Sequence, residues 1–199
     1  MNKIITIGRE FGSGGREIGR KLAEELGFAY YDKEIITEIA KRTELSERYV
    51  KTIVERRPVF SYPVHVGRSF LNVNTSTVIQ SSAVYAEQCK LLKEFAEKSD
   101  CVIVGRCADY VLREYDPFKI FVYADEKSKV ERCKKRDESG IEKTDKEYIK
   151  LIKSIDKNRA KYYDFYTGQT WGDKLNYDVC INTTDANMDD IVPHLAKMI

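Results

Sequence analysis

Short runs of apolar, β-branched and aromatic residues recur along the chain, and longer segments with helical periodicity separate them. Five such runs predict β-strands, over residues 3–8, 28–31, 101–105, 119–123 and 177–182. The runs KIITIG and CVIVG are apolar almost throughout, which is typical of strands that are buried on both faces. The alternation of strands and helices therefore favours an α/β fold with a parallel sheet that helices cover on both sides.

The segments between the runs predict helices. In residues 16–26, Ile18, Leu22 and Ala23 share one face, and Gly27 marks the end of the helix. Further helices are predicted over 33–42, 46–56, 76–98, 127–136, 146–163 and 188–198. We interpret the 199 residues as a single domain, in which residues 33–75 form a helical insertion and residues 136–145 form a lid.

The composition narrows the class of protein. Hydrophobic residues make up 42% of the chain and charged residues 33%, as expected for a folded globular protein. The net charge of +2 gives no reason to expect nucleic acid or a membrane as a partner. The five cysteines are scattered and contain no C-x-x-C pair, and no signal-peptide pattern opens the chain. We therefore expect a reduced protein in the cytoplasm.

A glycine-rich segment, GREFGSGGREIG at residues 8–19, lies between the first predicted strand and the first predicted helix. Backbone N–H groups in such a loop, together with the helix N-terminus, favour a phosphate group. If Gly15 is the last glycine of a P-loop, Arg16 takes the lysine position and Glu17 the Ser/Thr position. Glu17 then either binds a metal ion or only complements the helix N-terminus. The residues predicted to hold nucleotide phosphates are Gly12, Ser13, Gly14, Gly15, Arg16 and Glu17.

A nicotinamide site is an alternative interpretation of the same loop. Gly8, Gly12 and Gly14 fit the G-x-x-x-G-x-G spacing of short-chain dehydrogenases, and Asp32 could then hold a ribose. Such enzymes also need a Tyr-x-x-x-Lys pair on one helix, and the pairs with that spacing are Tyr115/Lys119 and Tyr123/Lys127. A glycine turn without any ligand is a third interpretation.

Arginines follow several of the predicted strands, where ligands bind in open parallel sheets. Arg106 comes just after the third strand, with Asp109 three residues on; Asp109 could position Arg106, hold water around a metal, or serve only as a helix-start acid. Arg132 and Arg136 form an i,i+4 pair, and Asp156 and Arg159 form an i,i+3 pair. Phosphoryl transfer depends mainly on positioning and charge neutralisation, so arginines from separate segments are suited to it. Solvated helix faces are the alternative explanation of the same arginines.

With these residues in view, the chain resembles the cytidylate kinase-like branch of the P-loop nucleoside monophosphate kinases, nearly from end to end. The resemblance rests on ITIGREFGSGGREIG, LGFAYYDKEII, VIVGRCADYVL, KIFVYADEKSKVERCKKR, the segment 156–159 and YDVCINTT. It implies a three-layer P-loop kinase sandwich with a five-stranded parallel sheet, an acceptor-binding helical insertion and a lid. It also implies that ATP and Mg²⁺ are the cofactors.

The resemblance assigns roles to individual residues. Gly12 to Arg16 would hold the ATP phosphates, and Arg132 and Arg136 would belong to the lid. By the same resemblance, Asp32, Arg106 and Arg159 would serve the acceptor. The spacing of the residues themselves adds Asp109 to the acceptor site, and we predict Arg16, Arg106, Asp156 and Arg159 as the catalytic set. The chain departs from cytidylate kinases proper at Gly15-Arg16-Glu17, where they carry Gly-Lys-[Gly/Ser/Thr], and at Val104, where they carry Asp.

We therefore predict an ATP-dependent phosphotransferase that acts on a small acceptor, a nucleoside monophosphate such as CMP. Two other hypotheses remain open at this point. One is a nucleotide-binding regulator that has lost catalysis, and the other is a short-chain NAD(P)-dependent oxidoreductase.

Overall fold

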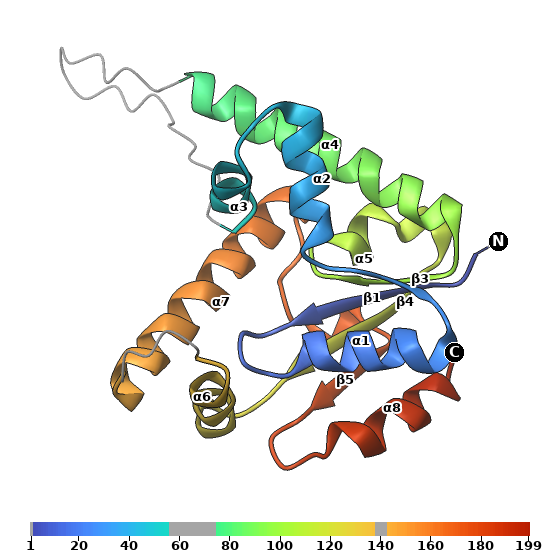
Figure 1. Ribbon diagram of the computed structural model, residues 1–199, viewed down its shortest axis with the longest axis vertical. Helices are drawn as coiled ribbons and strands as arrows, with labels where there is room; N and C mark the ends of the chain where they lie inside the picture. The colour runs from blue at the N-terminus through green and yellow to red at the C-terminus, as the bar shows by residue number, and fades with distance from the viewer. Residues whose placement is uncertain (1, 56–74, 138–142) are drawn as a thin grey trace.

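A five-stranded parallel sheet forms the centre of the part of the chain that the computed structural model describes, residues 2–55, 75–137 and 143–199 (Figure 1). Its strands are β1 (Ile4–Arg9), β2 (Ala29–Tyr31), β3 (Cys101–Val104), β4 (Phe118–Tyr123) and β5 (Val179–Asn182). They lie in the order β2-β3-β1-β4-β5. Because β1 is central and pairs with both β3 and β4, the glycine segment that follows it leaves the middle of the sheet.

Alternating side chains of the strands face opposite sides of the sheet. Ile5 and Ile7 pack into one core with the side chains of Val102 and Val104. Ile4 faces the other core, together with Cys101 and Ile103. Both faces are thus buried, which accounts for the continuous apolar runs in the sequence.

Helices cover both faces and give three layers (Figure 1). On one face lie α1 (Gly15–Leu26) and α8 (Met188–Ala196), and on the other lie α4 (Thr75–Lys98), α5 (Ala108–Val111) and α7 (Asp145–Thr167). The helices α2 (Glu34–Thr43) and α3 (Glu47–Glu55) join the second face, and α6 (Glu126–Lys135) packs against α7. Two short 3₁₀ turns, Arg113–Tyr115 and Lys174–Asn176, complete the described elements. The predicted three-layer α/β architecture is confirmed.

The ends of α7 show how local sequence sets a helix. Its N-terminus carries a capping box, in which Thr144 and Glu147 each bond the other's backbone N–H. The helix continues four residues beyond the predicted end at Tyr163 and stops at Gly168, which is left-handed (φ 69°). The extra turn forms because the side chain of Tyr166 stacks on Tyr85 of α4.

The predicted insertion and lid are described only in part. Within the insertion, α2 is tied to α4 by Arg42, whose guanidinium contacts Glu87 at 3.2 Å and Glu94 at 2.8 Å. Residues 56–74 of the insertion and 138–142 of the lid lie outside the described residues. The division of the chain at 33–75 and 136–145 therefore stays a prediction. Among the described residues, no helix has the length and apolar character needed to cross a bilayer.

The sheet order bears on the nicotinamide alternative. Dinucleotide-binding sheets of the Rossmann type have the order 3-2-1-4-5, whereas this sheet places β3 between β2 and β1. Neither Tyr-x-x-x-Lys pair lies on one helix, because Lys119 is in β4 and Tyr123 ends that strand. Both observations argue against a short-chain dehydrogenase.

Candidate active site

The glycine segment forms a tight loop between β1 and α1. Gly12 and Gly14 have φ values of 80° and 85°, in the left-handed region that side chains disfavour. A Cβ atom at position 12 would also lie 2.9 Å from the backbone oxygen of Lys129. The loop leads directly into α1 at Gly15, and the N–H groups of a first helical turn have no acceptor within the helix. The loop is therefore suited to bind an anion.

Side chains from two other segments hold the carbonyl groups of this loop. The hydroxyl of Thr183, just after β5, donates to the carbonyl of Ser13 at 2.7 Å. Arg132 donates to the carbonyl of Gly12 at 3.5 Å and also to that of Thr183. Ser13 itself is buried, and its hydroxyl donates to the carbonyl of Glu10 at 2.9 Å. Arg132, predicted as a lid cation, thus braces the loop in this structure.

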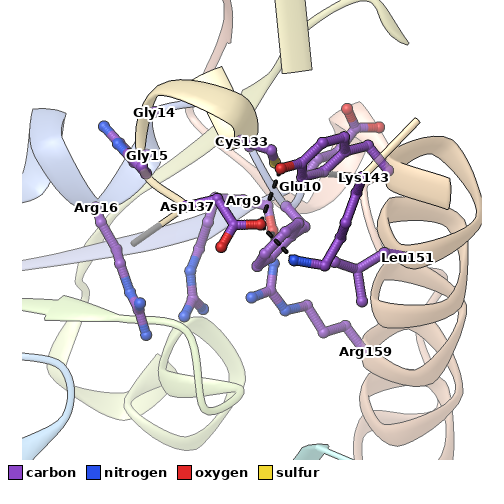
Figure 2. A pocket seen from close by; sticks show the side chains of 14 residues that line it. Arg9, Glu10, Gly14, Gly15, Arg16, Cys133, Asp137, Lys143, Leu151 and Arg159 are labelled. Atoms are coloured by element: carbon purple, nitrogen blue, oxygen red, sulfur yellow. Dashed lines mark hydrogen bonds and ion pairs between the residues drawn. The ribbon is translucent and has the colours of Figure 1, made fainter. Parts of the chain in front are cut away.

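A cavity of about 380 Å³ opens beside the loop (Figure 2). Its lining combines Gly12, Gly14 and Gly15 with five cationic side chains and two carboxylates; the cations are Arg9, Arg16, Arg136, Lys143 and Arg159, and the carboxylates are Glu10 and Asp137. In Figure 2 the side chains of Arg9 and Arg16, from the β1–α1 segment, and Arg159, from α7, extend toward one region. The cavity therefore offers peptide N–H groups and several cationic side chains, which are the groups that bind a polyphosphate.

Asp32, which follows β2, fixes the position of Arg16. Asp32 is buried; its Oδ1 accepts a hydrogen bond from Nη2 of Arg16 at 3.4 Å, and its Oδ2 forms an ion pair with Nε of Arg16 at 2.7 Å. The same Oδ1 lies 3.7 Å from the guanidinium of Arg9. Asp32 is thus already paired with two loop arginines, a role that sequence spacing did not indicate.

Asp156 connects α7 to the glycine loop. Its Oδ1 accepts the backbone N–H of Phe11 at 2.7 Å and lies 3.6 Å from Arg159. Its Oδ2 lies 3.8 Å from Lys129, which also pairs with Glu10 at 2.9 Å. The neighbouring Arg159 donates to the carbonyl of Arg9 at 3.2 Å. The predicted pair of Asp156 and Arg159 is therefore brought to the loop, with the carboxylate as a positioning group.

The pH dependence of the site should follow from Asp156, because burial raises the pKa of this carboxyl to about 6. Below that pH the neutral acid loses its attraction for Arg159 and Lys129, so catalytic efficiency should fall on an acid limb near pH 6. Folding stability should show the opposite trend: the folded pKa exceeds the unfolded value of about 3.9, so this group's contribution is full below pH 4 and decreases as pH rises to 6. A pH–rate profile and melting curves measure the two effects. Asp156→Asn should remove both, and an acid limb that persists in that variant would contradict the assignment.

A smaller cavity, about 50 Å³, lies next to the first and shares Arg9 and Arg159 with it. Arg106 and Asp109, which follow β3, line the smaller cavity together with aromatic side chains. Asp109 accepts from the hydroxyl of Tyr163 at 2.6 Å, and burial raises the pKa of its carboxyl. The predicted residues after β3 are thus placed beside those of the glycine loop.

Arg106 occupies an unusual backbone conformation. Three consecutive residues, Gly105, Arg106 and Cys107, have φ values of 75°, 62° and 53°. Non-glycine residues seldom adopt this region, and such strain concentrates at functional sites. The carbonyl of Arg106 accepts from the side chain of Gln88 at 3.0 Å, which holds the turn in place. Arg106 therefore belongs to a constrained turn before α5.

The sequence of the chain was compared with models of known protein families. The sequence model of the cytidylate kinase-like family matches residues 4–185, which include the glycine loop and every predicted site residue. The chain belongs to the cytidylate kinase-like family. A search of curated proteins gave no match.

Solved structures agree with this family's fold. An uncharacterized protein from Eubacterium ventriosum ATCC 27560 is 28% identical, has a TM-score of 0.72, and the match covers 100% of this chain and 98% of that one. Shikimate kinase from Bacteroides thetaiotaomicron is 15% identical, with a TM-score of 0.58 and coverage of 98% and 97%. Shikimate kinase from Acinetobacter baumannii, in complex with shikimate, is 15% identical, with a TM-score of 0.54 and coverage of 100% and 92%. The fold of this family member is that of a P-loop kinase, and family and fold together support a P-loop phosphotransferase.

P-loop kinases generally use ATP and Mg²⁺, and the loop conformation described above fits the phosphates of ATP. The usual magnesium ligand of such loops is a Ser/Thr hydroxyl in the first turn of the helix. In this family member that turn carries Arg16, which bonds to Asp32, and Glu17, which contacts Arg136 at 2.5 Å and Lys21 at 3.4 Å. These side chains do not reproduce that magnesium site. The same contacts place Arg136 and Glu17 together at the edge of the larger cavity.

Arg9 is the site residue that sequence reasoning missed. It ends β1, its side chain is 11% exposed, and it lines both cavities. The signal was present in the sequence, because a basic residue follows the first strand directly and precedes the loop glycines. It was overlooked because the motif places its cation after the glycines, not before them.

Proposed function

We propose that this protein transfers the γ-phosphoryl group of ATP to a small anionic acceptor, a nucleoside monophosphate such as CMP. The observation that carries the proposal is the position of Arg159, which lines the loop cavity and the smaller cavity at once. A cation at that junction is where a phosphoryl group in transit between two sites needs charge neutralisation.

The cavities suggest how the reactants would be divided. The larger cavity, with the glycine loop and Arg16, would hold the ATP phosphates, and Arg136 would lie at its edge. The smaller cavity, with Arg106 and Asp109, would hold the acceptor's anionic group. The acceptor oxygen forms a bond to the γ-phosphorus, and the bond from that phosphorus to the β–γ bridging oxygen breaks, releasing ADP. An ionised phosphate oxygen carries no proton, so a monophosphate acceptor needs no general base.

The described part of the insertion supports its role as the acceptor-binding segment. Val54 of α3 lines the smaller cavity along with Arg106 and Arg159; the aromatic side chains of the lining are Tyr162, Tyr163, Trp171 and Tyr177. The guanidinium groups of this small cavity suit the phosphate end of a nucleotide, and the nucleobase would extend beyond the cavity.

The proposal is tested by an ADP-release assay with a panel of acceptors, CMP, dCMP, UMP, AMP, GMP and shikimate, with and without Mg²⁺. We expect pyrimidine monophosphates to give the highest kcat/KM and to raise the melting temperature, because selective binding stabilises the folded state. If shikimate is the only acceptor that is turned over, the acceptor is not a nucleoside monophosphate and that part of the proposal is wrong. Absence of ADP release with every acceptor would contradict the proposed activity.

A nucleotide-binding regulator without catalysis is the second candidate. The ion pairs of Glu17 with Arg136 and Lys21, in the helical turn where a magnesium-binding hydroxyl is usual, favour it. Calorimetry with ATP separates the two candidates, since the regulator binds ATP tightly yet releases no ADP with any acceptor.

A further inference from the structure

The side chain of Arg9 crosses the glycine loop through space that two glycines leave open. At the first residue of α1, a Cβ atom on Gly15 would lie 2.5 Å from the Cβ of Arg9 and 3.1 Å from its Cγ. Real Cβ atoms do not approach other carbon atoms so closely. The base of the Arg9 side chain therefore occupies the room that a side chain at position 15 would need.

The guanidinium end of Arg9 depends on a second glycine. A Cβ atom on Gly105, directly after β3, would overlap Nη1 of Arg9. Gly105 is also left-handed, with φ of 75°, so glycine meets both the steric and the backbone requirement there. The two glycines thus direct the Arg9 side chain from the end of β1 toward the end of β3.

Position 15 can be aligned with the lysine position of the P-loop motif. The left-handed glycine that immediately precedes α1 is Gly14. If Gly14 is the last glycine of the motif, Gly15 takes the lysine position and Arg16 the Ser/Thr position. This alignment is shifted by one residue from the one that takes Gly15 as the last glycine. The lysine of a P-loop reaches the β- and γ-phosphates from that position. Here the position has no side chain, and Arg9 fills the same space.

The surroundings of Arg9 favour a multivalent anion. Its Nε is buried and has no hydrogen-bond partner among the described residues. Asp32 is the carboxylate that faces it, at 3.7 Å, whereas the guanidiniums of Arg16, Arg106 and Arg159 are close enough to act on its charge. Burial and these like charges lower the pKa of Arg9, and Asp32 opposes the shift. A bound polyphosphate would relieve the repulsion among the four guanidiniums.

We propose that Arg9 supplies, from strand β1, the phosphate-binding cation that P-loops ordinarily carry as lysine at the start of the helix. The inference rests on the proposed phosphoryl transfer and adds to it the residue that holds the β- and γ-phosphates. Arg16 is less suited to that place, because its side chain is 43% exposed and is already paired with the carboxylate of Asp32.

The first test is Arg9→Met, which keeps the base of the side chain against Gly15 and removes its charge. Affinity for ATP and for inorganic tripolyphosphate should fall about ten-fold or more, since a charged hydrogen bond to phosphate is lost. The matched control is Arg20→Met, on the exposed side of α1, where Arg20 pairs with Glu24. Calorimetry on both variants, with melting curves to confirm folding, gives the comparison. Wild-type affinity in Arg9→Met would overturn the proposal.

The second test moves the cation to the motif position. Arg9→Gly empties the space, and Arg9→Gly combined with Gly15→Lys fills it from the helix. The double variant should bind tripolyphosphate at least about ten-fold more tightly than Arg9→Gly and should recover a matching share of the ADP-release rate. Equal binding by the two folded variants would count against the inference.

These tests remain separate from the activity itself. If the wild-type protein releases no ADP with any acceptor, phosphoryl transfer is refuted, yet the tripolyphosphate titration still decides the role of Arg9. If transfer occurs and Arg9→Met retains both rate and affinity, the proposed function stands and the role of Arg9 is wrong.

Discussion

Replacement of Arg159 by alanine is expected to lower kcat/KM for phosphoryl transfer by about a hundred-fold or more, with less effect on the melting temperature. The guanidinium lines both cavities and lies 5.6 Å from the centre of the Phe11 ring, so under the proposed function it would neutralise the charge that develops during transfer. Steady-state ADP release with the best acceptor measures the change. Arg159→Lys should recover only part of the loss, because an ammonium group lacks the planar fork.

A matched control for Arg159 lies on the same helix. Lys157 is exposed on α7, and Lys157→Ala removes one positive charge without touching either cavity. The control should retain wild-type kcat/KM. Equal rates for Arg159→Ala and the wild-type protein would refute the role assigned to Arg159.

Gly14→Ala is expected to abolish detectable nucleotide binding under conditions where the wild-type protein saturates. An alanine Cβ would overlap the side chain of Met188, and the left-handed backbone adds about 1–3 kcal/mol of strain in the folded state. Rotation of the flexible Met188 side chain relieves the overlap, whereas relief of the backbone strain requires the loop to change shape, which misdirects the amides at the start of α1. Calorimetry with ATP and a melting curve measure binding and stability separately.

Gly27→Ala separates backbone strain from damage to the loop. Gly27 ends α1 with φ of 69°, and a Cβ atom there would meet no atom within 4 Å. This variant should lose stability through the left-handed backbone while it binds ATP normally. Comparable loss of ATP binding in both variants would show that the effect of Gly14→Ala is a general loss of stability.

The fold was predictable because its signals are local. The strands are short runs rich in apolar, β-branched and aromatic residues, and helices such as α1 end at glycines that adopt left-handed conformations. The errors are equally local: α7 continues to Thr167 because aromatic packing against α4 favours another turn, which no capping signal near Tyr163 reveals. The short helix α5 was not predicted as an element, since four residues carry no measurable periodicity.

The place of the candidate site in the fold was predictable, but the contacts between its side chains were not. Residues that follow parallel strands do gather at one edge, so Arg106 and the glycine loop are brought together as expected. The partners of each side chain were not predictable, because pairing depends on directions in space. Arg132 turns to the carbonyl of Gly12 and Glu17 turns to Arg136, contacts that span more than a hundred residues of sequence.

The bracing of the glycine loop by Thr183 and Arg132 has a consequence for the energetics of ligand capture. Because the carbonyls of Gly12 and Ser13 already have donors, their peptide planes are fixed before any ligand arrives. The conformational entropy of ordering the loop is therefore lost when the chain folds, and association with a polyphosphate need not include it. Mutation of Thr183, which lines neither of the two cavities described above, would then transfer that entropic cost from folding to association.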